Sequence, residues 1–537
     1  MKHFVAIILV WFLCKPVFSD VQVERWDRFE VSYYTQVKGN PFDVELTATF
    51  SHADTSFTVS GFYDGENKYV IRFMPPLEGK WRYVTHSDVK SQNKRSGTFE
   101  CIAPSPGNHG PVVPDGMHFS YADGKPYYPV GTTSYNWMHV DTSIQKQTIV
   151  SMEKSRFNKL RMLVFTHNFD KDYPEPLLFP FEIKSKKVDE KGRLVYEWDY
   201  DRFNPAYFRH IENCVDRLNA IGVEADMILF HPYDDGRWNF DRLPLPVCER
   251  YLKYVVARLG AFRNVWWSLA NEYDFLKFYK PADWDFFTKV VVDNDPYRHM
   301  CSIHSYTANY YAYWKDEYTH ASIQDHAPLQ LGAAGIVLNI YKKPVIFDEV
   351  CYEGNMDNRW GSLSSEEYIY RLWNGLSAGT YVTHGECYMD SPDDYSKDFL
   401  AIGGEFQGEA WKRIGFVLDI LEALPNPLNH CDPSWDLHTA SAGKHYYLVY
   451  LGKDVREEWT FELPEKNAGY PSLKEGVKFN EEQYQKSLPL IKTQLKALIA
   501  RDLWDMNEYF RIMNTTNESI QKALEILNSD EYQKKLK

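Results

Sequence analysis

The stretch Val265-Trp266-Trp267-Ser268-Leu269-Ala270-Asn271-Glu272 decides the fold of this 537-residue chain. An apolar run that stops abruptly on a carboxamide and a carboxylate predicts a buried β-strand that ends at a site. Parallel strands covered on both faces are continuously apolar, and in barrels of such strands the functional side chains lie at the C-terminal ends. We therefore expect Asn271 and Glu272 at the rim of a parallel barrel.

The same pattern recurs in Lys343-Pro344-Val345-Ile346-Phe347-Asp348-Glu349, where a second apolar strand ends on a glutamate. Side chains alternate between the two faces of a strand, so Asp348 should point away from Glu349 and act as a supporting or helix-facing group. Two glutamates at two strand ends predict a pair of carboxylates that act together.

Apolar strands alternate with helical segments between residues 112 and 424. The clearest helix begins with the cap Asn204 and with Pro205 at its first position, and it should stop at Gly222. Eight strands are expected, at residues 128–133, 160–165, 223–230, 264–269, 300–305, 321–325, 344–347 and 380–383. Eight such units over about 300 residues predict a (β/α)8 TIM barrel.

Two segments precede this barrel. Residues 1–19 carry Lys2, an apolar run and the compact Val17-Phe18-Ser19, which predicts a secretory signal peptide. We therefore expect an exported protein, periplasmic or extracellular. Residues 20–103 hold short strands with period-two alternation, as in Phe42 to Phe50, and predict a β-sandwich. The sandwich is expected to be a structural flank, with sugar binding as the alternative.

Two segments follow the barrel. Residues 425–470 contain strand patterns but are short for an independent core, so we expect a small, truncated β-domain. Residues 471–537 shift to Lys, Glu, Leu and Gln with apolar residues at helical spacing, which predicts a helical tail. The proline-rich insertion at 168–203, after the second strand, should shape the binding site.

Charge narrows the range of partners. A net charge of −14 argues against nucleic acid and anionic membranes, and no run after the leader is long enough to span a bilayer. The aromatic content of 16% suits stacking on sugar rings and equally suits the filling of a core, so composition alone does not decide between these two roles. No metal-ligand spacing is visible, and we expect no metal and no cofactor. The oligomeric state stays open.

A pair of carboxyl groups fits the cleavage of glycosidic bonds with retention of configuration. That reaction needs one protonated carboxyl and one ionised carboxylate about 5 to 5.5 Å apart. Strands four and seven face each other across the mouth of an eight-stranded barrel, so Glu272 and Glu349 can meet this requirement. Asn271 fits as a hydrogen-bond donor to the sugar 2-hydroxyl.

The two strand endings resemble those of the large clan of retaining TIM-barrel glycoside hydrolases that includes cellulases and β-galactosidases. On that resemblance Asn271-Glu272 match the acid/base motif and Glu349 matches the nucleophile. The layout, with its opening Gly131-Thr132-Thr133-Ser134-Tyr135-Asn136-Trp137, is similar to the exported apiosidase-like glycosidases of gut Bacteroidetes. The resemblance covers residues 20 to 465 and implies an exported retaining glycoside hydrolase that acts on an oligosaccharide or polysaccharide from plant or host.

Further residues at the strand ends are candidate sugar contacts, each with a structural role as its alternative. Trp137 and Trp360 are expected to be stacking platforms, and Glu386 a substrate contact or a rival catalytic carboxylate. The other candidates follow strands two, three, five and six: His167, Asn168, His231, His304, Tyr306 and His326.

Two other interpretations remain. A non-catalytic glycan-binding protein on a degenerate barrel would keep the fold and lack turnover. The tail, notably residues 495–504, resembles the C-terminal end of carboxy-terminal processing peptidases, but no peptidase core accompanies it and we infer no peptidase activity. The sequence does not predict the sugar, the linkage, or exo versus endo action.

Overall fold

The computed structural model describes residues 21–169, 175–188, 190, 192, 194–234, 236–306, 311–326, 330–392, 394–431, 438–443, 446–452, 481–503, 506–516, 522 and 525. The expected signal peptide at 1–19 lies outside this range. The chain divides into two compact units, residues 1–458 and 459–537.

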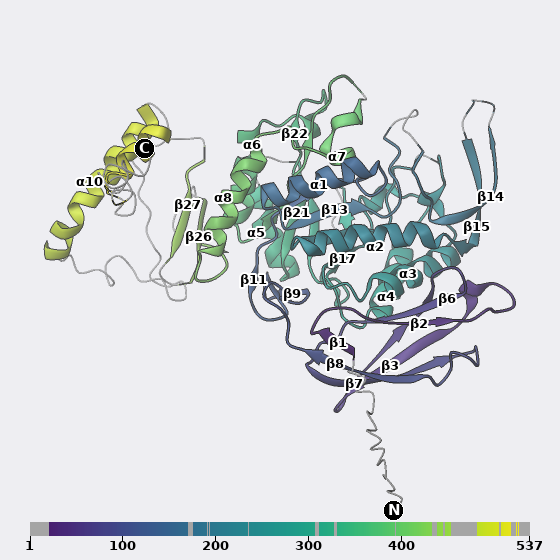
Figure 1. The fold of residues 1–537 in the computed structure, drawn as a ribbon. Helices are drawn as coiled ribbons and strands as arrows, with labels where there is room; N and C mark the ends of the chain where they lie inside the picture. Colours follow the sequence, from purple (N-terminus) through teal and green to yellow (C-terminus); the bar gives the residue numbers. More distant parts are fainter. Residues whose placement is uncertain are drawn as a thin grey trace, which may run out of the picture. The chain divides into compact units, whose positions relative to one another are not determined.

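Short parallel strands form the centre of the first unit. They make two sheets, in the orders β12-β13-β16-β17-β18 and β19-β20-β21-β23, so neighbours in the sheets follow the order of the chain (Figure 1). The strands are β12 (Gly131–Thr133), β13 (Lys159–Leu163), β16 (Glu224–Ile228), β17 (Val265–Ser268), β18 (Cys301–Ser302), β19 (His304–Ser305), β20 (Ala321–Gln324), β21 (Val345–Glu349) and β23 (Tyr381–Val382).

Each of the eight expected strand positions contains a β-strand, and one of them differs from the expectation. The fifth is interrupted at Ile303, which separates β18 from β19 and divides the parallel strands into two sheets. At the other edge a parallel bridge joins Thr132 to His384, just beyond β23. The strand order is the one expected for the predicted barrel.

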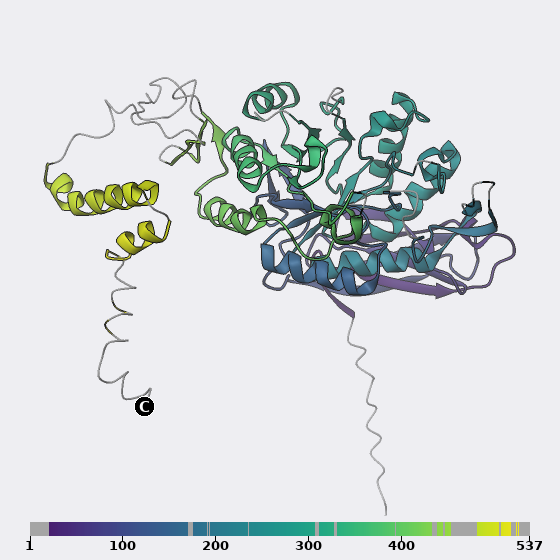
Figure 2. The same ribbon diagram turned by 90° about the horizontal axis from the view of Figure 1, so that it is seen from above.

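Helices lie outside these strands, as Figures 1 and 2 show. The start of α2 follows local chemistry, because Asn204 accepts a hydrogen bond from the Ala206 amide and Pro205 occupies the first position. The helices are α1 (Thr142–Ser155), α2 (Pro205–Ala220), α3 (Leu245–Leu259), α4 (Pro281–Asn294), α5 (Gln330–Tyr341), α6 (Ser365–Ser377), the short α7 (Phe399–Ile402) and α8 (Ala410–Glu422).

Two sheets of mainly antiparallel strands form the N-terminal region. One has the order β1-β8-β7-β3-β4 and the other β2-β6-β5, and both contribute to one aromatic cluster that includes Phe50, Phe73 and Phe99. The strands are β1 (Val21–Glu24), β2 (Phe29–Tyr34), β3 (Leu46–His52), β4 (Thr55–Ser60), β5 (Phe62–Tyr63), β6 (Lys68–Phe73), β7 (Gly79–Ser87) and β8 (Ser96–Ile102).

Buried ion pairs attach this region to the helices α2 and α3. Arg72 of β6 lies 2.8 Å from Glu212 of α2, and Arg258 of α3 lies 2.5 Å from the same carboxylate. Arg258 also lies 2.9 Å from Asp64. Separating the sheet from the two helices would leave uncompensated buried charges. The ion pairs therefore stabilise the contact between the N-terminal region and helices α2 and α3.

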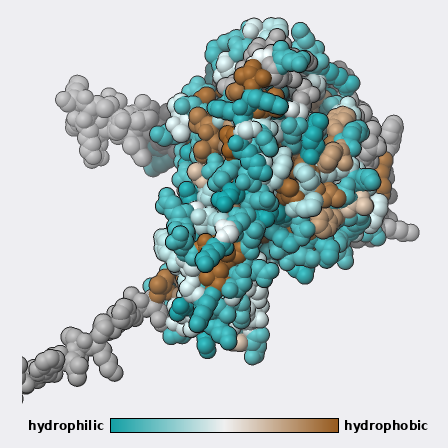
Figure 3. Space-filling model, turned by 90° about the vertical axis from the view of Figure 1, so that its right-hand side faces the viewer, coloured by the Kyte–Doolittle hydropathy of each residue, from teal (hydrophilic) through white to brown (hydrophobic). Residues whose placement is uncertain are grey.

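The first unit also contains several smaller sheets. The insertion at 168–203 is a β-hairpin of β14 (Phe181–Val188) and β15 (Leu194–Phe203), and a three-stranded sheet of β9 (Val112–Asp115), β10 (His118–Tyr121) and β11 (Pro126–Tyr127) precedes the barrel strands. The pair β22 (Glu353–Gly354) and β24 (Glu386–Cys387) lies beyond β21 and β23. One face, seen in Figure 3, is mainly hydrophilic with hydrophobic residues in separate patches.

The C-terminal part contains a small sheet and two helices. The sheet of β25 (Asn429–His430), β26 (His438–Ser441) and β27 (Tyr447–Tyr450) packs on α6, where Tyr450 stacks on Trp373. The second unit includes α10 (Glu481–Leu503) and α11 (Met506–Met513). In the described part of the chain no helix combines the length and apolar character needed to cross a bilayer.

Candidate active site

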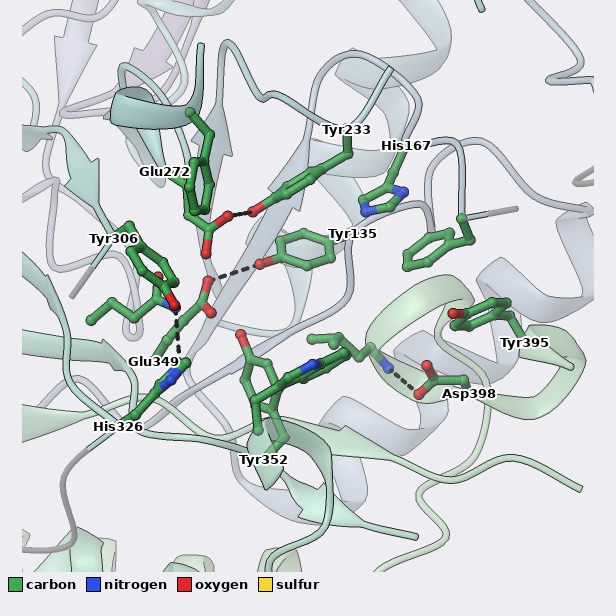
Figure 4. Close-up of a pocket in the computed structure, with 15 residues that line it drawn as sticks. Tyr135, His167, Tyr233, Glu272, Tyr306, His326, Glu349, Tyr352, Tyr395 and Asp398 are labelled. Carbon is green, nitrogen blue, oxygen red and sulfur yellow. Dashed lines mark hydrogen bonds between the residues drawn. The ribbon is translucent and has the colours of Figure 1, made fainter. Parts of the chain in front are cut away.

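A cavity of about 410 Å³ lies at the C-terminal ends of the parallel strands (Figure 4), within the size range of small-ligand pockets. Both glutamates expected from the sequence face it. Its lining consists of aromatic rings and a few polar groups: Tyr135, His167, Phe169, Tyr233, Glu272, Phe275, Tyr306, Gln324, His326, Glu349, Tyr352, Trp360, Tyr395, Asp398 and Leu400.

Glu272 lies four residues beyond the end of β17. Its backbone has φ 44° and ψ 53°, the left-handed region that non-glycine residues seldom occupy. This turn ends the strand and starts the short helical turn Tyr273–Phe275. The side chain is 9% exposed, and Oε2 accepts a hydrogen bond from the Tyr233 hydroxyl at 2.8 Å.

Glu349 is the last residue of β21. Its Oε1 accepts a hydrogen bond from the Tyr135 hydroxyl at 2.9 Å, and Arg161 Nη1 lies 3.6 Å from the same oxygen. His304 Nε2 is 4.0 Å away. Burial lowers the pKa of His304 to about 4, so this imidazole is neutral and the positive charge beside Glu349 comes from Arg161.

Asn271 connects the two tyrosines. Its Nδ2 donates to Tyr233 Oη at 2.5 Å and to Tyr135 Oη at 3.3 Å, while its Oδ1 accepts from Arg161 Nη2 at 2.9 Å. Both amide hydrogens are therefore used within the protein, and the side chain is fully buried. In this arrangement Asn271 orients the donors of Glu272 and Glu349, and its expected donation to a sugar hydroxyl stays a prediction.

The surroundings of Glu272 favour a proton on its carboxyl group. Burial, followed by the charge of Glu349, raises the pKa of Glu272 to about 7, although the Tyr233 hydrogen bond opposes the shift. Glu349 has the Arg161 guanidinium beside it. The environment thus favours a proton on Glu272, the group that would act as the acid in acid-base chemistry on one bond.

Charged residues inside the parallel sheets support this pair from below. Lys159 Nζ lies 2.6 Å from Asp226 and 3.0 Å from Asp348, and both Lys159 and Arg161 are fully buried. Although burial opposes ionisation, the charges of Lys159 and Arg161 hold the pKa of Asp348 well below its usual range. Asp348 therefore neutralises the positive charges of Lys159 and Arg161, and so stabilises the buried guanidinium that lies beside Glu349.

Four of the expected supporting residues line the cavity: His167, Tyr306, His326 and Trp360. His167 stacks on Tyr233 with ring centroids 4.5 Å apart. The Tyr306 amide donates a hydrogen bond to Asp274 Oδ1 at 2.9 Å. His326 pairs with Gln324 at 3.0 Å.

Besides Asn271, five expected residues do not line the cavity, and their contacts explain why. Trp137 is fully buried, with Nε1 directed at the Met162 sulfur, so its ring cannot serve as a stacking platform. His231 uses Nε2 on the Phe165 carbonyl and accepts from the Tyr233 amide at Nδ1, which makes it a structural histidine.

The other three are also supporting groups. Asn168 accepts from Arg237 at 2.8 Å. His304 lies behind the glutamates and accepts from the Glu272 amide at 3.4 Å. Glu386 is fully buried, accepts from the Gln407 and Gly408 amides and does not line the cavity, so its contacts favour a structural role.

One cluster has the composition of a metal site, Glu353, His384 and Glu386. Both carboxylates are already used by backbone amides before and at the start of α8, since Glu353 accepts from Glu409 and Ala410 in addition to the bonds to Glu386. The positive end of a helix dipole disfavours a cation at this position. The cluster is better described as a cap of α8.

Several functional groups were not found from the sequence, namely Tyr135, Tyr233, Arg161, Phe275 and Asp398. Arg161 had a usable signal, because a charged residue inside the apolar run Leu160 to Leu163 must be paired. Tyr233 and Asp398 belong to irregular segments, whose position depends on tertiary packing. The 168–203 insertion contributes Phe169 to the lining, and the described part of its hairpin contributes none.

Comparison with known proteins agrees with this geometry. Residues 114–388 match the family described as "Apiosidase-like, catalytic domain". Residues 22–88 match a domain of unknown function (DUF5060), and residues 472–505 match another family of unknown function (DUF8443). No curated protein matches the chain significantly.

Among solved structures, a candidate glycoside hydrolase from Bacteroides vulgatus is 53% identical, with a TM-score of 0.81, and the match covers 84% of this chain and 89% of that one. An endo-1,4-β-mannanase from Rhizomucor miehei is 13% identical with a TM-score of 0.40, covering 58% and 99% of the two chains, too distant to support a conclusion. The family match spans more than half of the sequence, and the chain therefore belongs to the apiosidase-like family.

Proposed function

We propose that this protein is an exported retaining glycoside hydrolase that acts on an oligosaccharide or polysaccharide of plant or host. The observation that carries the proposal is the pair Glu272 and Glu349, which face one cavity from the ends of β17 and β21, with burial and the neighbouring carboxylate holding Glu272 toward the protonated form. The family match and the resemblance to the Bacteroides vulgatus protein support it.

In the proposed mechanism Glu349 attacks the anomeric carbon while Glu272 gives its proton to the leaving oxygen. The glycosidic C–O bond breaks and a glycosyl ester with Glu349 forms. Glu272, now ionised, takes a proton from water, which attacks the anomeric carbon and releases Glu349. Tyr135 and Tyr233 keep the two carboxylates in place during both steps.

The proposal includes the scaffold and the location. We infer that the parallel strands form a closed (β/α)8 barrel, which the bridge from Thr132 to His384 supports. Export rests on the leader-like residues 1–19, and cell fractionation of the full chain tests it. The peptidase-like resemblance of the tail adds no activity to the proposal.

The deciding experiment compares the wild type with Glu349→Gln on a panel of plant and host glycans. A loss of about 1000-fold or more in turnover is expected, because the variant cannot form the glycosyl-enzyme. NMR of the first product formed should show the anomer of the substrate. Near-normal turnover by Glu349→Gln would contradict the assignment, and binding without release by the wild type would favour a glycan-binding protein.

A further inference from the structure

The cavity has two ends with different chemistry. At one end Phe275 lies three residues after Glu272, and its amide donates to the Glu272 carbonyl at 2.9 Å. Its ring is 44% exposed and lies 4.7 Å from the ring of Tyr306. Asp274 fixes this pair, because its carboxylate accepts from the Tyr306 amide. The result is an exposed aromatic surface directly beside Glu272.

The other end carries a single carboxyl, Asp398, near the ring pair of Phe169 and Tyr395, whose centroids lie 4.9 Å apart. Figure 4 shows Asp398 and Tyr395 on the side of the cavity away from Glu272 and Tyr306, with Tyr352 between them. Asp398 is 1% exposed, its Oδ1 accepts from the Leu400 amide at 3.2 Å, and within the described residues it forms no ion pair with Lys or Arg. Burial raises the pKa of this carboxyl to about 8.

The charged side chains that line the cavity are all carboxyls, because Arg161 is buried against Glu349 and does not belong to the lining. The 15 described lining residues include three carboxyl groups and no Lys or Arg. Burial keeps the pKa of His167 well below its usual value and lowers that of His326, so neither imidazole supplies a cation near neutral pH. A uronic acid, sulfate or phosphate group would therefore enter without a counter-charge.

We propose that substrate binds in one direction, with the leaving sugar on Phe275 and Tyr306 and a hydroxyl of an uncharged glycone hydrogen-bonded to Asp398. This inference rests on the proposed function. The acid donates its proton to the leaving oxygen, so the leaving group must lie on the Glu272 side of the bond. Sugar rings present C–H faces that pack on exposed aromatic rings. The Asp398 carboxyl accepts backbone hydrogen bonds from Leu400 and Tyr388, and a carboxyl group has further hydrogen-bonding capacity that a sugar hydroxyl can use.

The direction predicts which substrates each substitution should affect. A panel of 4-nitrophenyl glycosides first identifies the glycone, and two probes with that glycone are then compared: a disaccharide and the glycosyl fluoride. Fluoride is a small leaving group that does not reach an aromatic platform. The ratio of kcat/KM for the two probes does not depend on how much of a preparation is correctly folded.

Phe275→Ala should lower kcat/KM about tenfold on the disaccharide and less than about twofold on the fluoride. Asp398→Asn should lower kcat/KM about tenfold on both probes, because both carry the same glycone. Phe278→Ala and Asp394→Asn are matched controls. Phe278 is 57% exposed, and neither residue lines the cavity.

Equal losses on both probes for Phe275→Ala, or wild-type values for Asp398→Asn, would overturn the direction. Preferred release of a 4-nitrophenyl glucuronide or galacturonide would overturn the uncharged glycone. If Glu349→Gln is inactive while these results are found, the proposed function stands and only the subsites are wrong. If Glu349→Gln hydrolyses both probes, the proposed function fails and this inference fails with it.

Discussion

Tyr233 donates a hydrogen bond from its hydroxyl to Oε2 of Glu272 across 2.8 Å. The bond stabilises the ionised carboxylate and so opposes the burial that raises the pKa of Glu272 to about 7. Two opposing effects thus set the pKa of Glu272: burial favours the protonated form, and the hydrogen bond from Tyr233 favours the ionised form. Both half-reactions of a double displacement need this balance, because the same group must act first as acid and then as base.

The balance predicts a pH dependence. For the wild type, kcat/KM should fall as pH rises through about 7, because the protonated fraction of Glu272 declines. Tyr233→Phe removes a bond to the ionised form, so the pKa of Glu272 should rise and the fall should move to higher pH. Tyr388→Phe is the control, since Tyr388 donates to Glu353 outside the cavity. An unmoved profile in Tyr233→Phe would show that the bond does not set this pKa.

Tyr135→Phe should weaken the other half of the site. The substitution removes the 2.9 Å hydrogen bond to Glu349 and leaves the ring in place. We expect a loss of about tenfold in kcat/KM, the size of one hydrogen bond to a charged group, with little change in melting temperature. Steady-state kinetics and a thermal melt measure the two quantities, and unchanged kinetics would contradict a positioning role.

Glu386→Gln tests the rival carboxylate. Glu386 accepts from the Gln407 and Gly408 amides away from the cavity, and a glutamine oxygen can accept one of these bonds. Activity should stay within a few-fold of the wild type while thermal stability falls. A loss comparable to that of Glu349→Gln would place Glu386 in the chemistry after all.

Lys159→Met tests the buried charge cluster. The substitution leaves Asp226 and Asp348 without their closest cation, and removal of one partner from a buried pair costs about 3–5 kcal/mol. Urea unfolding should therefore show a large drop in the free energy of unfolding. The control Lys397→Met removes an exposed pair with Asp390 and should change little. Equal unfolding curves would show that the cluster contributes no stability.

The sequence predicts the strands that carry the glutamates well, because their signal is local. Val265–Ser268 is an apolar run long enough to be a buried strand, and the polar residues after it mark its exit. Asn204 and Pro205 likewise identify the start of α2 through chemistry contained in two residues. The prediction that Glu349 lies at the end of a buried strand rests on the same reasoning as the prediction for Glu272.

The remainder of the site depends on contacts between distant segments. Trp137 looks like a platform in the sequence, but its indole is buried against Met162 because the segment after β12 folds inward. Asp398 lies more than 100 residues from Glu272 in a stretch without periodicity, and only packing brings both to one cavity. The role of Asn271 depends on its hydrogen bonds to Tyr135 and Tyr233. No local sequence pattern predicts that these two tyrosines lie close to it.

The left-handed backbone of Glu272 has an evolutionary consequence. A non-glycine residue in that conformation costs about 1–2 kcal/mol, and glycine would remove the cost. The local backbone at this turn therefore favours glycine, and a lineage released from selection on turnover would meet no backbone penalty on replacing the glutamate with glycine. A glutamate retained at this position is a mark of continued selection for chemistry.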